Sequence, residues 1–226
     1  MKTSNQLLLG FMGLLVIGML FSAIILKAGY NKGITNNPAY DKRQKPDPDY
    51  TKASLPPFKA LVLTSPAGLT PGNNTPPDVV INAAADYSLE SYKNIVSHQS
   101  GDTLFIDIRK MHDITVNCPS LNYIHNTSSC NIFMHGLVFN QLDMYGGPHV
   151  RSYFNDVTVR RLNYTGDTTN VLEFGEVANL DSVNIIMHKN GSLYLYTSYN
   201  YGDIKVDSLA NLTIAGKAVN SLKKMN

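Results

Sequence analysis

The segment DTLFIDIRK, residues 102–110, carries the residue types that enzymes use to cleave polysaccharides. Such chemistry needs two carboxyl groups, or an Asp, Arg and Lys cluster, on one face of the fold. Side chains of a regular strand alternate between faces, so Asp107 and Arg109 share one face and Asp102 lies on the other. The spacing therefore predicts a surface ion pair. We assign no catalytic residues, and a carbohydrate-active enzyme is kept as an alternative.

Metal and cofactor chemistry find little support in the sequence. The six histidines occur singly, without the HxH or HExxH spacing of metal ligands. His112 and Asp113 are adjacent, as a general base and its orienting carboxylate would be, yet no nucleophile stands at a diagnostic spacing. The stretches YGGPH (145–149) and KNGS (189–192) lack the flanks of a phosphate loop and are typical of turns. We expect neither a metal nor a cofactor.

Two cysteines, Cys118 and Cys130, bracket the segment PSLNYIHNTSS. In an oxidising compartment they could close a short loop, which stabilises a fold by about 3 kcal/mol at best. A disulfide requires their Cα atoms to lie within about 7 Å. The sequence leaves two interpretations open, one disulfide or two separate thiols.

Four tyrosines fall within LYLYTSYNYGD, residues 193–203. In a regular strand, Tyr194 and Tyr196 point away from the face that carries the leucines, whereas Tyr199 and Tyr201 share the leucine parity. We expect Tyr199 and Tyr201 to help close the core. We therefore predict Tyr194 and Tyr196 as ligand-facing aromatics able to stack on a sugar or peptide. The alternative is ordinary strand propensity, which favours exposed tyrosine without a ligand.

The elements that must position these residues have a period of two. Short alternating or β-branched runs predict strands over 58–64, 78–83, 103–108, 113–118, 156–162, 183–188, 192–196, 203–206 and 211–216. A helix over AAADYSLESYKNIV (83–96) is a minor alternative. The Asn-Gly pair at 190–191 also indicates an antiparallel hairpin. The fold class is therefore all-β.

A weak internal repeat favours a solenoid over a β-sandwich. FNDVTV (154–159), LDSVNI (180–185) and LANLTI (209–214) share a pattern of aliphatic and polar positions at similar, though unequal, spacings. Repeats of this length suit coils that stack their apolar positions on one another. We expect a right-handed parallel β-helix or similar solenoid, with the sandwich as the alternative.

The chain divides into an anchor, a tether and this β domain. Residues 7–26 run without a charge and are long enough, at about 1.5 Å per residue, to cross a bilayer as a transmembrane helix. Residues 1–6 form a short cytoplasmic tip, 27–57 a polar, proline-rich flexible tether, and 58–226 the folded domain. A net charge of +2 gives little phosphate steering, so we expect no nucleic-acid partner.

Several features of the sequence resemble a bacterial family. They are the single span, the tether, the run FKALVL, the segment DVVINAAADYSLESYKNIVSHQSGDTLFIDI and the short strands punctuated by Asn and Gly. This is the auto-transporter adhesin head, or GIN domain, family of Bacteroidetes. The resemblance implies a right-handed β-helix and an extracytoplasmic interaction module, with no catalytic residues to carry over. The sequence departs from the family at TSPAGLTPGNNTPP, residues 64–77.

These observations predict a single-pass, membrane-anchored binding or structural protein without catalytic activity. Basic residues between 27 and 45 favour a cytoplasmic C-terminus. We nevertheless expect the domain on the periplasmic side, because its composition and the resemblance fit a cell-envelope protein. The predicted partners are the bilayer, through residues 7–26, and an envelope glycan or protein. An accessory subunit of an envelope transport or signalling complex is a further alternative.

Overall fold

The computed structural model describes Gly13, Met19, Ser22 and Lys27 and the ranges 49–65, 76–93, 95–109 and 112–219. The chain forms two compact units, Met1–Pro48 and Asp49–Asn226. Within the described residues, no helix is long and apolar enough to cross a membrane. The predicted membrane helix over 7–26 falls almost wholly outside the described residues and stays a prediction.

The second unit begins before the predicted domain boundary at Phe58, because it starts at Asp49. Tyr50–Ser54 forms strand β1, which pairs antiparallel with β4, Ser88–Tyr92. The last part of the segment assigned to the tether, 27–57, is thus part of the sheet. Proline enrichment indicated a linker there, but the residues of β1 lie between the prolines and are free to pair.

The second unit consists of strands and one short 3-10 helix, η1, as far as it is described. The bounds of the remaining elements are β2 (Ala60–Thr64), β3 (Asp78–Ala83), β5 (Val96–Ser100), β6 (Thr103–Asp107), β7 (Ile114–Cys118), β8 (Tyr123–Asn126), β9 (Asn131–His135), β10 (Val138–Phe139), β11 (Leu142–Gly146), β12 (Arg151–Phe154), β13 (Thr158–Gly166), β14 (Val171–Phe174), β15 (Asn179–Met187), β16 (Gly191–Leu195), β17 (Tyr201–Val206), β18 (Leu209–Ile214) and η1 (Gly216–Ala218).

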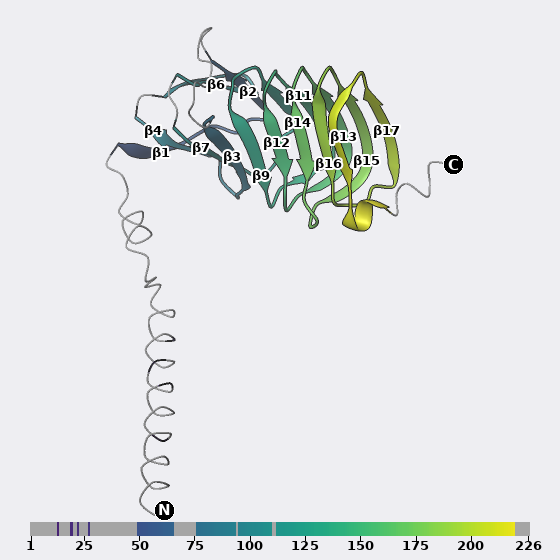
Figure 1. Ribbon diagram of the computed structural model, residues 1–226. Coiled ribbons are helices and arrows are strands. Elements are labelled where there is room, and N and C mark those ends of the chain that lie inside the picture. Colours follow the sequence, from purple (N-terminus) through teal and green to yellow (C-terminus); the bar gives the residue numbers. More distant parts are fainter. Residues whose placement is uncertain are drawn as a thin grey trace, which may run out of the picture. The chain divides into compact units, whose positions relative to one another are not determined.

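The strands form two nine-stranded sheets. Sheet A has the order β1-β4-β7-β3-β9-β12-β14-β16-β18, and sheet B the order β17-β15-β13-β11-β8-β2-β6-β5, with β10 paired to β13. Most neighbours are parallel, whereas β1 with β4, β4 with β7 and β5 with β6 are antiparallel, so both sheets are mixed. Figure 1 shows the two sheets facing each other, with the strands of each side by side along the unit.

From β11 onward the chain passes alternately between the sheets, and each strand pairs in parallel with a preceding strand of its own sheet. In sheet A, Ser152 pairs with Ile132, and Asn211 pairs with Ser192. In sheet B, Asn179 pairs with Thr158. The step between paired positions is therefore nearly constant along the stack. This constancy places equivalent side chains in rows that run across the strands.

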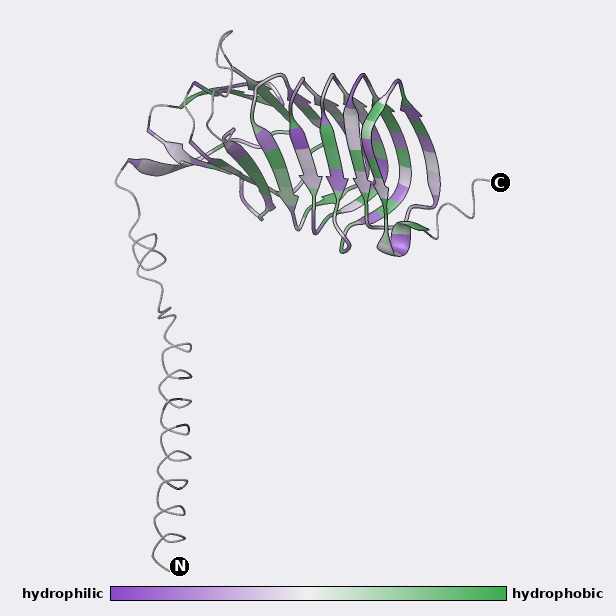
Figure 2. Ribbon diagram, viewed as in Figure 1, coloured by the Kyte–Doolittle hydropathy of each residue, from purple (hydrophilic) through white to green (hydrophobic). Residues whose placement is uncertain are grey.

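Alternation along each strand builds the core between the sheets. In β9, for example, Ile132 and Met134 are buried while Asn131, Phe133 and His135 are partly exposed. Figure 2 shows this as hydrophobic and hydrophilic bands that alternate along the strands. The core residues all lie within 58–218, so the second unit contains the whole described core. A unit with its own core folds without the rest of the chain, and we expect 49–226 to do so.

The repeat spacing inferred from the sequence was wrong. Residues 180–185 belong to β15 in sheet B, whereas 209–214 is β18 in sheet A, so the alignment joined strands of different sheets. The observed repeat is shorter: Leu180 pairs with Val159, whereas the alignment matched it to Phe154. The motif misled because any strand with one buried face alternates aliphatic and polar residues.

Two local predictions are also corrected. The Asn-Gly pair at 190–191 does not close an antiparallel hairpin, since β15 and β16 lie in different sheets. Asn190 adopts φ of 61°, and this left-handed residue turns the chain from one sheet to the other. The alternative of a helix over 83–96 is wrong, because β4 and the start of β5 occupy that stretch.

Candidate functional site

One row of side chains crosses all the strands of sheet A on the face that points away from the core. Register places its members side by side, and none of them is fully buried. At about 4.8 Å between neighbouring strands, the row is roughly 38 Å long. We call it the outer row, and in spatial order it comprises Lys52, Glu90, Thr115, Val80, Phe133, Tyr153, Glu173, Tyr194 and Thr213.

Aromatic rings form the centre of the outer row. Phe133 and Tyr153 lie on adjacent strands and contact edge to face, with ring centroids 5.8 Å apart. Tyr194 lies two strands beyond Tyr153, with Glu173 between them. An ion pair of 3.4 Å joins Glu173 Oε2 to Arg151, which neutralises the carboxylate between the two tyrosines. The centre of the outer row therefore presents aromatic surface, and the one carboxylate between its tyrosines is paired.

Hydrogen bonds hold the two tyrosines of this row. The Tyr153 hydroxyl donates to Asn155 Oδ1 at 3.3 Å. Asn211 Nδ2 donates to the Tyr194 hydroxyl at 3.1 Å. A ring whose hydroxyl is fixed loses less conformational freedom when a ligand stacks on it. Both rings are thus partly preorganised.

A second row lies two residues further along the same strands and carries mostly hydroxyl and amide groups. Within it, Asn155 Nδ2 lies 3.4 Å from His135 Nδ1, and Gly175 leaves room for the Asn155 amide. These groups offer donors and acceptors beside the aromatic centre. We call this the amide row, and it comprises Ser54, Ser88, Asn117, Asn82, His135, Asn155 and Tyr196.

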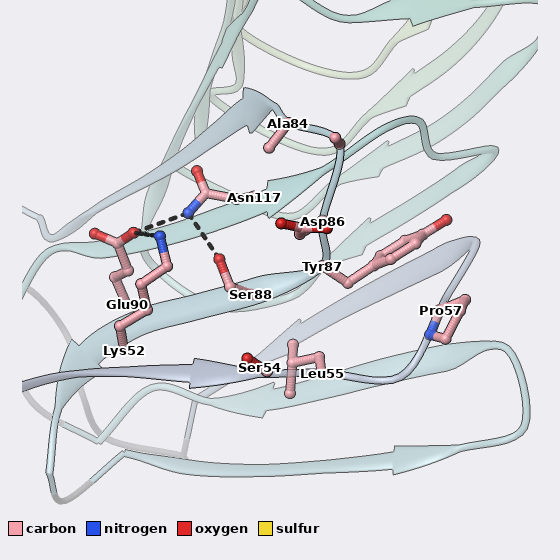
Figure 3. Close-up of a pocket in the computed structure, with 11 residues that line it drawn as sticks. Lys52, Ser54, Leu55, Pro57, Ala84, Asp86, Tyr87, Ser88, Glu90 and Asn117 are labelled. Carbon is pink, nitrogen blue, oxygen red and sulfur yellow. Dashed lines mark hydrogen bonds and ion pairs between the residues drawn. The ribbon is translucent and has the colours of Figure 1, made fainter.

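Both rows begin in a pocket of about 520 Å³ at the β1, β4 and β7 end of sheet A, which we call the edge pocket. Lys52 Nζ lies 2.8 Å from Glu90 Oε1, and Asn117 Nδ2 donates to Glu90 Oε1 at 3.0 Å and to Ser88 Oγ at 3.1 Å (Figure 3). Its lining comprises Lys52, Ser54, Leu55, Pro57, Ala84, Ala85, Asp86, Tyr87, Ser88, Glu90 and Asn117.

The chemistry of the edge pocket suits binding. The Glu90 carboxylate is paired with a cation and accepts an amide hydrogen bond, so its charge is compensated. Tyr87 also lines the edge pocket (Figure 3), and its ring contacts that of Phe58 at a centroid distance of 5.0 Å. A lining that combines compensated polar groups with apolar side chains can orient a hydroxyl-bearing ligand.

The structure places the predicted ligand-facing tyrosines on this surface. Tyr194 is in the outer row and Tyr196 in the amide row, both partly exposed, while the intervening Leu195 is buried. Tyr199 is buried as expected, and burial raises the pKa of its hydroxyl. Tyr201 was predicted to help close the core, which is wrong, since it is 73% exposed at the start of β17. That tyrosine follows a turn into sheet B, where the parity of β16 no longer applies.

The acidic residues of 102–110 lie in sheet B, away from these rows. Arg109 Nε contacts Asp107 Oδ2 at 2.8 Å, which confirms the predicted ion pair, and Asp102 instead faces Lys59 at 3.8 Å. His112 stacks on Tyr92 with centroids 4.1 Å apart. Among the described residues, no cluster of three or more His, Cys, Asp or Glu side chains could hold a metal ion.

Cys118 and Cys130 are free thiols, which is the second of the two interpretations that the sequence leaves open. Cys118 pairs with Ala83 at one end of β3, whereas Asn131, the residue after Cys130, pairs with Asp78 at the other end. The two thiols are therefore separated by the length of β3, roughly 17 Å at about 3.3 Å per residue. A disulfide spans less than half of that distance. Sequence separation suggested proximity, but the chain folds through β8 between the two cysteines.

We predict that neither thiol of the folded protein reacts at pH 8 with a thiol reagent such as Ellman's reagent. Burial raises the pKa of both cysteines to about 12, and the thiolate is the reactive form. Both thiols should be labelled in denaturant without reductant, and labelling of the native protein should rise only as the pH approaches 12. Rapid labelling at pH 8, or a two-dalton mass shift on reduction, would contradict this assignment.

Sequence reasoning missed Phe133, Tyr153 and the edge pocket. The segments NIFMH (131–135) and RSYF (151–154) each place an aromatic residue at an outward position. This was the available signal, but only the register reveals that the two rings are neighbours. The edge pocket depended on β1, which was assigned to the tether.

The sequence matches no protein-family model, and no curated protein matches it. The solved structures similar to this chain include three from Bacteroides and Parabacteroides species. A putative adhesin from Bacteroides fragilis is 16% identical, covers 74% of this chain and 94% of its own, and has a TM-score of 0.46. A putative lipid binding protein from Parabacteroides distasonis is 13% identical, with coverages of 76% and 95% and a TM-score of 0.40. A putative adhesin from Parabacteroides merdae is 10% identical, with coverages of 74% and 92% and a TM-score of 0.36.

Structural neighbours of this chain thus include proteins named as putative adhesins from Bacteroidetes, at low identity. The names of these three proteins describe adhesion or binding.

Proposed function

We propose that this chain is a non-catalytic, adhesin-head-like binding protein, anchored in a bacterial membrane by residues 7–26 with its β domain on the periplasmic side. The uncharged run of that span supports the anchor. We further propose that the domain is a right-handed parallel β-helix related to the GIN domain. The nearly constant step between parallel partners supports coils, and parallel crossovers are nearly always right-handed.

The ligand we propose is a surface glycan that lies across the strands of sheet A, along the outer row. The observation that carries this is the in-register line of Phe133, Tyr153 and Tyr194, three partly exposed rings on one face. Rings stack on the apolar faces of sugars, and the adjacent amides hydrogen-bond hydroxyl groups. A row of roughly 38 Å suits a polymer better than a single sugar.

The test is binding of the protein to a panel of acidic and neutral oligosaccharides of increasing length. We expect affinity to rise with length as more of the outer row is covered. Replacing Tyr153 or Tyr194 with alanine should weaken binding about fivefold each, from roughly 1 kcal/mol per stacked ring. The two rings are about 10 Å apart, so the double variant should lose about 25-fold.

Tyr201→Ala is the matched control, because Tyr201 is an exposed strand tyrosine of sheet B outside the outer row. The Tyr201→Ala variant should bind the oligosaccharides with the same affinity as the unaltered protein. Equal loss in Tyr201→Ala and Tyr194→Ala, or no loss in either, would refute the outer row as the binding site. Cleavage of an oligosaccharide that is abolished in Glu90→Gln would instead favour the enzyme interpretation.

The proposed topology is tested by C-terminal fusions to alkaline phosphatase, which is active only after export, and to a cytoplasmic reporter. We expect activity from the phosphatase fusion and membrane association of the full chain. Deleting residues 7–26 should release the protein from the membrane fraction. An active cytoplasmic reporter would reverse the proposed orientation.

A further inference from the structure

A second, chemically different cavity lies at the β17 and β18 end of the core. It has a volume of about 340 Å³ and opens between the last strand of sheet A and the last strand of sheet B. We call it the end cavity, and its lining comprises Leu193, Leu195, Tyr199, Ile204, Val206, Leu209, Leu212 and Ile214.

Every side chain of this lining is aliphatic except Tyr199. Leu193, Leu195 and Tyr199 are buried and form the floor, whereas Leu209 and Leu212 are 38% and 50% exposed and form the rim. A cavity with such walls gives water few hydrogen-bond partners, and apolar cavities of this kind remain dry or take apolar guests. The end cavity is thus a hydrophobic site that is open to ligands at its rim.

A second copy of the chain fills this space poorly. A two-fold contact whose axis passes through the end cavity would place one cavity opposite the other, which leaves both unfilled. The neighbouring edge strand β17 also carries the Asp203 and Lys205 ion pair, 2.9 Å apart, whose charges disfavour edge pairing. A slender apolar molecule, in contrast, can enter from the rim and contact the floor.

We propose that the end cavity binds the hydrocarbon chain of a fatty acid. Ligand sites range from about 300 to 1,000 Å³, and a cavity at the small end of this range suits one chain rather than two. The aliphatic walls supply hydrophobic contact along the chain, while the carboxylate stays in water beyond the exposed rim. This site is separate from the outer row, so it stands or falls independently of the proposed glycan function.

The direct test is displacement of a fluorescent fatty acid from the unit 49–226 by saturated fatty acids of increasing length. Each buried methylene should strengthen binding about fourfold, until the chain fills the cavity and the gain stops. A single-chain lysophospholipid and a two-chain phospholipid form the comparison arms. We expect the fatty acid to bind more tightly than the two-chain phospholipid, and the reverse order would overturn the choice of ligand.

Leu212→Asp should weaken fatty-acid binding at least about tenfold, because it brings a negative charge to the rim of an apolar site. Val138→Asp is the matched control, since Val138 is also an exposed aliphatic residue but lies on β10 of sheet B. Both variants should keep the thermal unfolding midpoint of the unaltered unit, which separates lost binding from lost folding. Equal affinity in Leu212→Asp and the unaltered unit would overturn the proposal.

The full chain provides a second measurement. Cells that express it are fed a fatty acid with a photoreactive diazirine, and crosslinked peptides are mapped by mass spectrometry. We expect adducts on the peptides that contain Leu193 or Leu212, and their loss in Leu212→Asp. Absence of these adducts would show that the cavity holds no fatty acid. A dimer that Leu212→Asp dissociates would instead assign the cavity to a second copy of the chain.

Discussion

Replacing Phe154 with alanine is expected to lower the free energy of unfolding by about 3–5 kcal/mol, the usual cost of removing a buried phenylalanine. Phe154 is completely buried in β12, and its ring lies 4.9 Å from that of Phe174 on the adjacent strand. The strands on both sides of β12 are themselves paired, so the backbone has little freedom to close the space. Urea unfolding followed by circular dichroism measures the change.

The adjacent Tyr153 supplies the control, because it points outward from the same strand and is partly exposed. Tyr153→Ala should cost about 1 kcal/mol or less, as surface substitutions do. Phe154→Ala should also weaken glycan binding, since the packing of Phe154 fixes the strand that carries Tyr153. A stability loss below about 1 kcal/mol for Phe154→Ala would show that the stack has little cooperative packing.

The all-β class was predictable because a strand with one buried face alternates between apolar and polar residues, and this alternation can be read in the sequence. Each of the runs chosen from the sequence overlaps an observed strand, such as DVVINA, which is β3. Strands such as YIHN (β8) and VLEF (β14) were missed, since such short runs do not separate alternation from chance. The tertiary pairing, rather than local propensity, makes these segments strands.

The candidate site was harder to predict than the fold. Tyr194 and Tyr196 were identified because alternation within one strand sets their direction. The rows, however, depend on pairings between segments that are distant in the sequence, as between Val80 and Phe133. The regular step between parallel partners begins with the pairs β8–β11 and β9–β12, whereas β8 and β9 themselves pair with the distant strands β2 and β3. The antiparallel strands β4 and β5 lie in the interval that separates them. The residue pattern of one strand does not indicate which distant strands pair with it.

The two ends of the domain differ in their chemistry. At the β1 end, the strands pair antiparallel, and paired charges and amides line the edge pocket. At the β18 end, the parallel stack stops with aliphatic side chains still exposed. Stacked repeats require a polar or covered terminal surface to remain soluble. An apolar ligand in the end cavity would satisfy this requirement where the described chain does not.

Asn170→Ala is expected to destabilise the domain by about 2–4 kcal/mol, because it leaves two buried polar groups without their partner. Asn170 is completely buried, its Nδ2 donates to the Gly147 carbonyl at 2.9 Å, and its Oδ1 accepts a hydrogen bond from the Tyr164 hydroxyl. Burial also raises the pKa of Tyr164, as expected for a hydroxyl held away from water.

A double-mutant cycle separates this hydrogen-bond effect from simple loss of packing. Asn170→Ala leaves the Tyr164 hydroxyl without this partner, and Tyr164→Phe removes that hydroxyl. The loss of stability in the double variant should therefore be smaller than the sum of the two single losses, by about 1 kcal/mol or more. The pair is closely packed in the unaltered protein, where a Cβ added at Gly146 would lie 2.7 Å from the Tyr164 hydroxyl. Strict additivity in urea unfolding would mean that the Tyr164 hydroxyl keeps a sufficient partner without Asn170, and the Ser152 hydroxyl, 3.5 Å away, is in a position to be that partner.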